Sequence, residues 1–331
     1  MAERYALGID FGGTKVLAAV VSLRTGEIVS SAKKKTRPDD GPEELVQRIF
    51  SVAQAALDDA GASQRAPVIS AIGIGMAGQV DPVAGVLLGT PNLAQSSVEL
   101  PIAARLTERF AVPAVLRNDV HIAAVGEQRF GAGHDAASFL CVFVGTGIGG
   151  ALVQDGQLVT GFTGTAGEIG HIIVDADGRL CGCGGRGHLE AYSSRTAMTK
   201  VILGEIKRGR ATRLTEVFAL DDGTLGRGAA LRSGMLSRAV TDGDELVTEV
   251  VRDAARYLGF GLASVINVVN PQRLILGGGV IEAVDLMFEV AAETARREAL
   301  PVAGRGIEIV RAGLGDNSGV VGAAMIAGGA A

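Results

Sequence analysis

Glycine clusters that directly follow short apolar segments are the feature that most constrains this chain. Glycine contributes 48 of the 331 residues, about twice the usual ~7%. Three clusters occupy residues 10–15 (DFGGTK), 145–150 (GTGIGG) and 277–279 (GGG). They follow no three-residue repeat, and only 9 prolines are present, which excludes a collagen-like chain. Because backbone that closely approaches a ligand needs residues without a Cβ, the clusters predict ligand-binding turns at strand ends.

The segments around the first two clusters repeat one layout, which predicts the fold class. The first half is expected to hold three strands, a helix and a returning strand at 5–10, 16–22, 27–32, 42–60 and 68–74. The second half repeats this order at 138–144, 148–153, 157–160, 245–267 and 273–276, followed by a helix at 281–298. A strand meander followed by a helix and a strand that rejoins the sheet predicts two related α/β halves with a cleft between them.

The domain boundaries follow from this repeat. An N-terminal α/β domain is expected over 1–117, with a C-terminal helix at about 316–331 packing back on it. The C-terminal α/β domain is expected over 118–315, with a hinge near 116–122. Mixed charge and glycine over 206–232 indicate a helical insertion with loops.

Composition and charge exclude several classes of protein. The chain has 31 Lys and Arg against 36 Asp and Glu, a formal charge of −5, so no strongly basic surface is available for nucleic acid. With 47% apolar and 20% charged residues, a soluble globular protein is expected, and its core is aliphatic because aromatics reach only 4%. No membrane span is expected, since no uninterrupted apolar run reaches about 18 residues. Three cysteines and the lack of a signal-peptide pattern predict a reducing, cytoplasmic location.

The glycine turns are expected to hold the phosphates of a nucleotide. Residues 145–150 contain a GxGxxG spacing, but a strand and hairpin follow where a dinucleotide-binding fold needs a helix. The P-loop sequence GxxxxGK followed by Ser or Thr is absent. Backbone N–H groups of two hairpins can clamp a triphosphate from two sides, with hydroxyls from Thr14 and Thr146 and with Asp10 holding Mg²⁺ through water. The alternative is that the clusters are only tight hairpins.

Asn118 and Asp119 lie between an apolar strand pattern at 112–116 and a helix pattern. One interpretation is a plain helix N-cap, a position that Asn and Asp both favour. The other is a general base at a strand-to-helix junction, where a carboxylate takes the proton of a substrate hydroxyl as phosphate arrives. Spacing alone leaves both interpretations open.

Two cysteines and two histidines supply a candidate metal site. The set consists of His171, Cys181, Cys183 and His188. Four thiolate and imidazole ligands suit closed tetrahedral zinc, and the glycines between them let the loop turn tightly. The alternative is a pair of reduced thiols on a flexible loop. Cys141 lies within an apolar strand pattern and is expected to be a small core residue.

The chain resembles the ROK family of bacterial sugar kinases and repressors. The matching segments run in family order along nearly the whole chain: LGIDFGGTK (7–15), GMAGQVD (75–81), PNL (91–93), NDVHIAAVGE (118–127), GTGIGGALV (145–153), GEIGH (167–171), CGCGGRGHLE (181–190) and LGGGV (276–280). Each motif is weak alone, but the combination is specific. The resemblance implies an α/β protein of two actin-like ATPase (ribonuclease H-like) domains with an interdomain cleft.

The resemblance further implies an ATP-dependent hexose kinase, most simply a glucokinase acting on the 6-hydroxyl of glucose, with Mg²⁺ and a structural Zn²⁺. Asp119 is implied as the catalytic base. The implied sugar contacts are Gly78, Asn92, Asn118, Asp119, Glu168, His171 and Glu190. ATP and Mg²⁺ are implied to lie around Asp10, Gly12, Gly13, Thr14, Gly145, Thr146, Gly147, Gly277 and Gly278. In this family the histidine at position 171 can serve both zinc and sugar through its two ring nitrogens.

Two departures from the family pattern define the alternatives. His188 stands where the family usually has a third cysteine, so a Cys2His2 zinc site is expected. The segment after PNL lacks a Trp often seen in glucokinases, which leaves mannose, fructose, allose or an N-acetylated amino sugar as alternative substrates.

A sugar-sensing repressor of the same family and a polypeptide-handling ATPase are the alternatives from other classes. A homodimer or homotetramer is expected, with no nucleic-acid or membrane partner.

Overall fold

The first half of the chain forms a five-stranded sheet of order β3-β2-β1-β4-β7. The computed structural model describes residues 3–37, 41–62, 67–89, 99–214 and 231–329. The strands are β1 (Tyr5–Phe11), β2 (Lys15–Ser22), β3 (Ile28–Lys35), β4 (Ile69–Met76) and β7 (Ala114–Asn118). The first three are antiparallel neighbours joined by short turns, whereas β4 and β7 run parallel to β1 because each follows a helical crossover. The four strands predicted for this half are confirmed.

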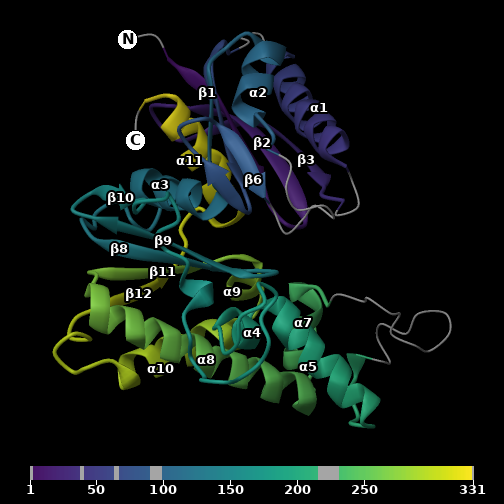
Figure 1. Cartoon of the computed structure of the whole chain (residues 1–331), viewed down its shortest axis with the longest axis vertical. Coiled ribbons are helices and arrows are strands. Elements are labelled where there is room, and N and C mark those ends of the chain that lie inside the picture. Colours follow the sequence, from purple (N-terminus) through teal and green to yellow (C-terminus); the bar gives the residue numbers. More distant parts are fainter. Residues whose placement is uncertain (1–2, 38–40, 63–66, 90–98, 215–230, 330–331) are drawn as a thin grey trace. The chain divides into compact units, whose positions relative to one another are not determined.

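Helices cover both faces of this sheet (Figure 1). They are α1 (Pro42–Gly61), α2 (Ile102–Phe110), α3 (Asp119–Phe130) and α11 (Ser318–Ala327). Successive side chains of a strand point to opposite faces, so Leu7 and Ile9 pack with α1 whereas Ala6 packs with α11. The helix from the C-terminal end of the chain therefore completes the core of the first half, on the face opposite α1 and α2.

Two strand glycines let α11 pack very close to the sheet. A Cβ at Gly8 would lie 1.8 Å from the carbonyl oxygen of Val320. A Cβ at Gly73 would lie 1.9 Å from the carbonyl oxygen of Ala323. Both distances are too short for any side chain, so this helix–sheet contact requires glycine. Part of the glycine excess thus serves packing, a use that the sequence pattern did not predict.

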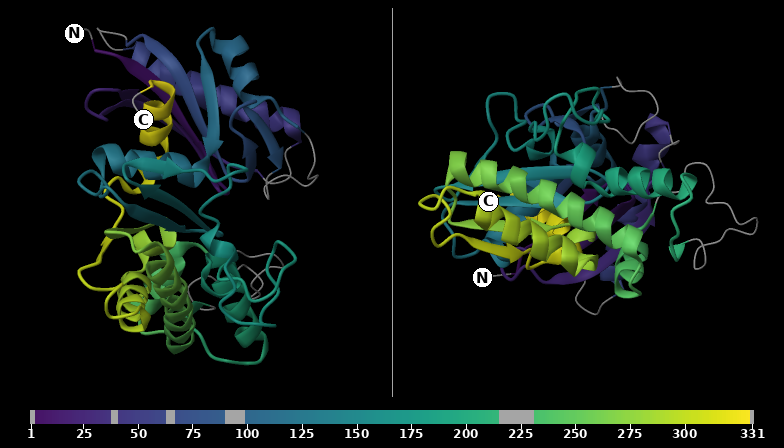
Figure 2. Two further views of the ribbon diagram at one scale, coloured as in Figure 1. Left: turned by 60° about the vertical axis from the view of Figure 1, so that its left-hand side comes forward. Right: turned by 90° about the horizontal axis from the view of Figure 1, so that it is seen from below.

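The second sheet has the order β10-β9-β8-β11-β12, which repeats the order of the first. Its strands are β8 (Phe139–Val144), β9 (Ile148–Gln154), β10 (Gln157–Val159), β11 (Arg273–Gly277) and β12 (Glu308–Arg311). Two sheets of one topology confirm the prediction of two related α/β halves. The long helix α8 (Glu245–Val269) packs along α10 (Asp285–Glu298), as both views of Figure 2 show.

The helix predicted at about 281–298 is confirmed over Asp285–Glu298, but a break precedes it. The structure contains α9 (Gly279–Ala283) and α10, separated at Val284. The backbone of Val284 is extended, with φ −122° and ψ 94°, and its side chain is buried. A β-branched residue fits extended backbone well, and tertiary burial here overrides the helical pattern of the flanking residues.

The other described elements connect these layers. They are β5 (Gln79–Asp81), β6 (Val86–Gly89), α4 (Glu190–Ser193), α5 (Arg195–Lys207), α7 (Ser233–Thr241) and the 3₁₀ helices Ile169–His171 and Gly315–Asn317. Strands β5 and β6 form a small antiparallel hairpin that was not predicted. Most of the insertion predicted at 206–232 lies outside the described residues. Within the described part of the chain, no helix is both long and apolar enough to cross a bilayer.

Packing divides the chain into two compact units. The first comprises residues 1–140, 151–167 and 312–331, and the second comprises 141–150 and 168–311. By this division α3 belongs with the first unit. The domain boundary between residues 117 and 118 and the hinge near residues 116–122 both stay predictions.

Candidate functional site

The first glycine turn, between β1 and β2, is closed by its own hydrogen bonds. The Gly12 N–H donates to the Lys15 carbonyl at 3.0 Å, and the Thr36 hydroxyl donates to the Gly12 carbonyl at 2.9 Å. The Gly12 N–H is thus already used, which leaves Gly13 and Thr14 as the candidates for phosphate contacts in this turn.

Three carboxylates and a lysine of the first unit lie around the end of β1. Lys15 pairs with Asp316, with 2.5 Å between Nζ and Oδ2. Burial, followed by the negative charge of Asp119, raises the pKa of Asp10 to about 7. Asp316 adds to that rise and Lys15 opposes it. Sequence motifs left Lys15 without a chemical role. In the structure its partner is Asp316, an acid from the far end of the chain.

The raised pKa of Asp10 predicts a pH-dependent stability. The folded protein holds the Asp10 proton more tightly than an unfolded chain, so this group favours folding at low pH and loses that contribution as pH rises from 3.8 toward about 7. In EDTA, Asp10→Asn is expected to melt above the wild-type chain at pH 8, with a smaller difference at pH 5. Differential scanning calorimetry measures both, with the exposed Asp59→Asn as control. Equal differences at the two pH values would contradict the raised pKa.

The structure gives the helix-cap function to Asn118. The Asn118 side chain caps α3, since its Oδ1 accepts from the Val120 and His121 N–H groups at 2.9 and 3.2 Å. Its Nδ2 donates to the Gly78 carbonyl at 3.4 Å, which brings two predicted sugar-binding residues together. Asp119 is the first residue of α3, directly after the capping residue Asn118. The carboxylate of Asp119 therefore lies at the positive end of the helix dipole.

The second glycine turn, between β8 and β9, is held by the start of α5. The Gly145 N–H donates to the Gly147 carbonyl at 2.9 Å. The Arg195 guanidinium donates to the Thr146 hydroxyl at 2.7 Å, and the Thr196 hydroxyl donates to the Thr146 carbonyl at 2.7 Å. Burial lowers the pKa of Arg195. Sequence reasoning missed this cation beside the second glycine turn, because no motif links it to Thr146, which lies 49 residues earlier.

Gly278 follows β11 and has a backbone that only glycine adopts readily. Its φ is +86°, and a Cβ would lie 2.6 Å from the carbonyl oxygen of Val144. Gly278 thus lies against the end of β8, directly before the second glycine turn, and Gly277 is the last residue of β11. The structure brings the second and third glycine clusters together at neighbouring strand ends.

Glu190 lies between the second glycine turn and the cysteine loop. Its Oε2 accepts from the Ile148 N–H at 2.9 Å, and its Oε1 is 3.9 Å from the sulfur of Cys181. A Cβ at Gly147 would lie 2.4 Å from this carboxylate, so the glycine makes room for the acid. One oxygen of Glu190 is thus fixed by backbone, and the other faces the loop of predicted metal ligands.

The four predicted metal ligands come together in the second unit. The candidate ligand atoms of His171, Cys181, Cys183 and His188 all lie within 4.8 Å of one another. The Cys183 sulfur is 3.2 Å from His188 Nδ1. His171 Nδ1 is buried without a hydrogen-bond partner, whereas its Nε2 lies 3.8 Å from Glu168. A buried nitrogen without a partner, facing two thiols and a second imidazole, is the arrangement that a metal ion satisfies.

Other residues singled out by the sequence fall outside this arrangement. Asn92 lies outside the described residues. His121 is buried on α3, with Nε2 3.0 Å from the Ala166 carbonyl. Cys141 is fully buried in β8, as expected of a core residue.

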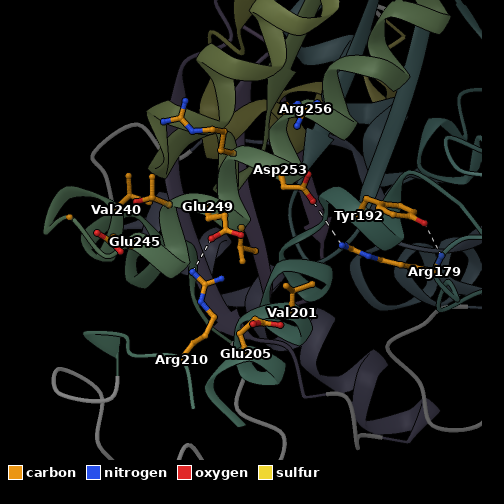
Figure 3. Close-up of a pocket in the computed structure, with 14 residues that line it drawn as sticks. Arg179, Tyr192, Val201, Glu205, Arg210, Val240, Glu245, Glu249, Asp253 and Arg256 are labelled. Carbon is orange, nitrogen blue, oxygen red and sulfur yellow. Dashed lines mark hydrogen bonds and ion pairs between the residues drawn. The ribbon is translucent and has the colours of Figure 1, made fainter. Parts of the chain in front are cut away.

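A cavity of about 950 Å³ lies along the first half of α8, beside α5 and α7 (Figure 3). Arg210 pairs with Glu249 at 2.8 Å, and Arg179 approaches Asp253 at 3.9 Å. None of the residues predicted to bind sugar, nucleotide or metal lines it. Its acids and bases largely neutralise each other, so it does not point to a ligand of one charge.

Two sheets of one strand order, each with a glycine turn after its first strand, define the actin-like ATPase class of α/β proteins. The sequence profile of the ROK family matches residues 6–330, and the chain belongs to the ROK family.

Relatives agree with this assignment over nearly the whole chain. A glucokinase of Streptomyces coelicolor is 33% identical over 328 residues, which cover 97% of this chain and 96% of that protein. A glucokinase of Halalkalibacterium halodurans is 31% identical over 323 residues, covering 97% and 94%. The crystal structure of a ROK family glucokinase from Streptomyces griseus, in complex with glucose and AMPPNP, matches with a TM-score of 0.83 at 32% identity, covering 98% and 99%. The predicted family and fold class are thereby confirmed.

Proposed function

We propose that this chain is an ATP-dependent glucokinase, which transfers the γ-phosphoryl group of ATP to the 6-hydroxyl of glucose. The observation that carries the proposal is the similarity over 98% of the chain to the Streptomyces griseus glucokinase, whose structure contains glucose and AMPPNP. The two glucokinase relatives, similar over 97% of the chain, support the same activity.

Asp119 is the base in the proposed mechanism. It takes the proton of the 6-hydroxyl while the hydroxyl oxygen attacks the γ-phosphorus in line, and the bond from that phosphorus to ADP breaks. The cap by Asn118 leaves the Asp119 carboxylate at the start of α3, near the positive end of the helix dipole. The sugar is held by the predicted contacts, which are Gly78, Asn92, Asn118, Glu168, His171 and Glu190.

The two glycine turns hold ATP in this proposal. The phosphates contact Gly13 and Thr14 in the first turn and Thr146 and Gly147 in the second. The remaining predicted contacts in these segments are Gly12, Gly145, Gly277 and Gly278. Arg195, bonded to Thr146 at 2.7 Å, adds positive charge beside the second turn.

Mg²⁺ fits the acids of the first unit. Asp10 and its neighbours Asp119 and Asp316 offer the oxygen ligands that this hard cation prefers, and a cation there would relieve the repulsion that raises the pKa of Asp10. When bound, Mg²⁺ neutralises charge that develops on the phosphates.

Zinc fits the loop of His171, Cys181, Cys183 and His188. The ligand number and type are those of a closed structural site, and the partnerless His171 Nδ1 supplies one ligand. Burial raises the pKa of the Cys181 thiol, so zinc binding must release its proton. Zinc would fix the orientation of His171, whose other nitrogen is then free for a sugar hydroxyl.

A coupled assay of ADP release across a panel of hexoses tests the function. Glucose is expected to give the highest kcat/KM, and the product is expected to be glucose 6-phosphate. A clear preference for mannose, fructose, allose or an N-acetylated amino sugar would move the chain to another kinase of the family. Sugar binding without ADP release from any hexose would instead favour a regulator.

Repeating the assay with polyphosphate tests the phosphate donor, and sedimentation analysis tests the proposed homodimer or homotetramer.

A further inference from the structure

Glu127 is a fully buried carboxylate that the proposed chemistry does not use. It lies on α3, eight residues after Asp119, and its side chain is 0% exposed. Its Oε2 accepts from the N–H groups of Ala132 and Gly313, both at 2.8 Å. Its Oε1 accepts from the Leu314 N–H at 2.9 Å and the Ser318 hydroxyl at 2.7 Å. The four donors fill the hydrogen-bonding capacity of a carboxylate, and none of them is a cation.

Three of these donors belong to the segment that leads into α11. Residues 313–318 follow β12, include the 3₁₀ helix Gly315–Asn317 and end at the first residue of α11. The carboxylate of Glu127 therefore fixes both ends of this segment to α3. Glycine makes room for the contact, since a Cβ at Gly131 would lie 2.2 Å from Glu127 Oε2.

The same segment carries groups to the acids at the end of β1. Asp316 lies within it and pairs with Lys15 at 2.5 Å. Gly319 directly follows it, and a Cβ there would lie 2.6 Å from Asp10 Oδ2. A shift of residues 313–318 would therefore move Asp316, the partner of Lys15. It would also move the start of α11 toward Asp10 or away from it.

We propose that Glu127 is a positioning residue for the nucleotide-binding end of the site, acting through residues 313–318 on Lys15, Asp316 and Asp10. The proposal rests on the proposed function only in taking these three residues as neighbours of ATP and Mg²⁺. A carboxylate is required because three of the four contacts come from backbone N–H groups, which can only donate and which reach both of its oxygens, whereas a neutral amide can accept at only one of its two ends.

The test is the affinity for Mg²⁺·AMPPNP in Glu127→Gln, measured by calorimetry. Dissociation constants are expected to rise roughly tenfold or more, because displacement of a positioned group by about 1 Å can cost up to ~10²-fold. The affinity for glucose without nucleotide is expected to stay unchanged. This binding readout does not depend on turnover, so the wild-type hexose assay judges the glucokinase proposal separately.

Asp244→Asn is the matched control. Asp244 is also buried, and its donors within the described residues include the Thr212 hydroxyl and the N–H groups of Arg213 and Val247, none of which carries a charge at the bonded group. It caps α8 in the second unit, and neither it nor its partners are proposed site residues. Both variants are expected to lower the melting temperature, but only Glu127→Gln is expected to weaken Mg²⁺·AMPPNP. Equal nucleotide affinity in the two variants would show a merely structural carboxylate and overturn the proposal.

A milder variant keeps the proposal open to test if Glu127→Gln does not fold. Ser318→Ala removes one of the four hydrogen bonds to Glu127. It is expected to weaken Mg²⁺·AMPPNP in the same direction, and unchanged affinity would overturn the proposal.

Discussion

Replacing Asp119 with asparagine is expected to lower kcat for glucose phosphorylation by about 10²- to 10⁴-fold, the usual contribution of a general base. Asparagine has the shape of aspartate but cannot take the proton of the 6-hydroxyl. The α3 cap belongs to Asn118, so the helix should keep its start in the variant. The measurements are steady-state kinetics for turnover and calorimetry for glucose, whose affinity is expected to change little.

The control for this experiment is Asp155→Asn, at an exposed hairpin turn. Asp155 has φ +50°, a conformation that asparagine also accepts, so folding and turnover are expected to remain as in the wild-type chain. Near-normal kcat in Asp119→Asn would remove this residue from the mechanism. A large loss of glucose affinity in that variant would instead make Asp119 mainly a sugar-binding residue.

Loss of zinc is expected to have the second large effect. The purified chain is expected to carry about one zinc ion, bound by four ligands. Cys183→Ala removes one of them and is expected to weaken zinc affinity by more than roughly 100-fold. Without the metal, His171 loses its fixed orientation, so KM for glucose should rise and thermal stability should fall. Metal analysis by mass spectrometry measures the loss of zinc, steady-state kinetics measures KM, and calorimetry measures the thermal stability.

Substitutions of His188 and Cys141 provide the controls for the zinc site. His188→Ala is expected to lose zinc, whereas His188→Cys keeps four ligands and should retain it. Cys141→Ala should retain zinc as well, since Cys141 is buried in β8 and is not one of the clustered ligands. Less than about half an equivalent in the wild-type chain, prepared without chelators, would count against zinc.

Much of the fold was predictable because its signals are local. Apolar periodicity located most strands and the long helices of both halves, and the repeat of that pattern predicted two related halves, which share one sheet order in the structure. The clustering of the candidate metal ligands was predictable for the same reason, since three of the four lie within eight residues, 181–188. The helix break at Val284 was missed because burial, which no local pattern reports, overrides propensity there.

The interpretation of Asn118 and Asp119 shows how far a motif alone can go. Both residue types favour the cap position, so their spacing could not separate a cap from a base. The structure separates them by hydrogen bonds, giving the cap to Asn118. The glycines likewise have two roles that the sequence does not separate. Gly8 and Gly73 allow α11 to pack on the sheet, and only three-dimensional contacts distinguish them from the glycines of the turns.

The sequence by itself determined the family, the two related halves, the glycine turns and the four residues that cluster as candidate metal ligands. Only the tertiary structure revealed the pairing of Lys15 with Asp316, the bond from Arg195 to Thr146 and the burial of Glu127. The physical reason is distance along the chain. Glu127 and the Ser318 hydroxyl are 191 residues apart in sequence, yet 2.7 Å apart in space. A contact of this kind forms when α11 packs against α3, and no short-range pattern of residues specifies it.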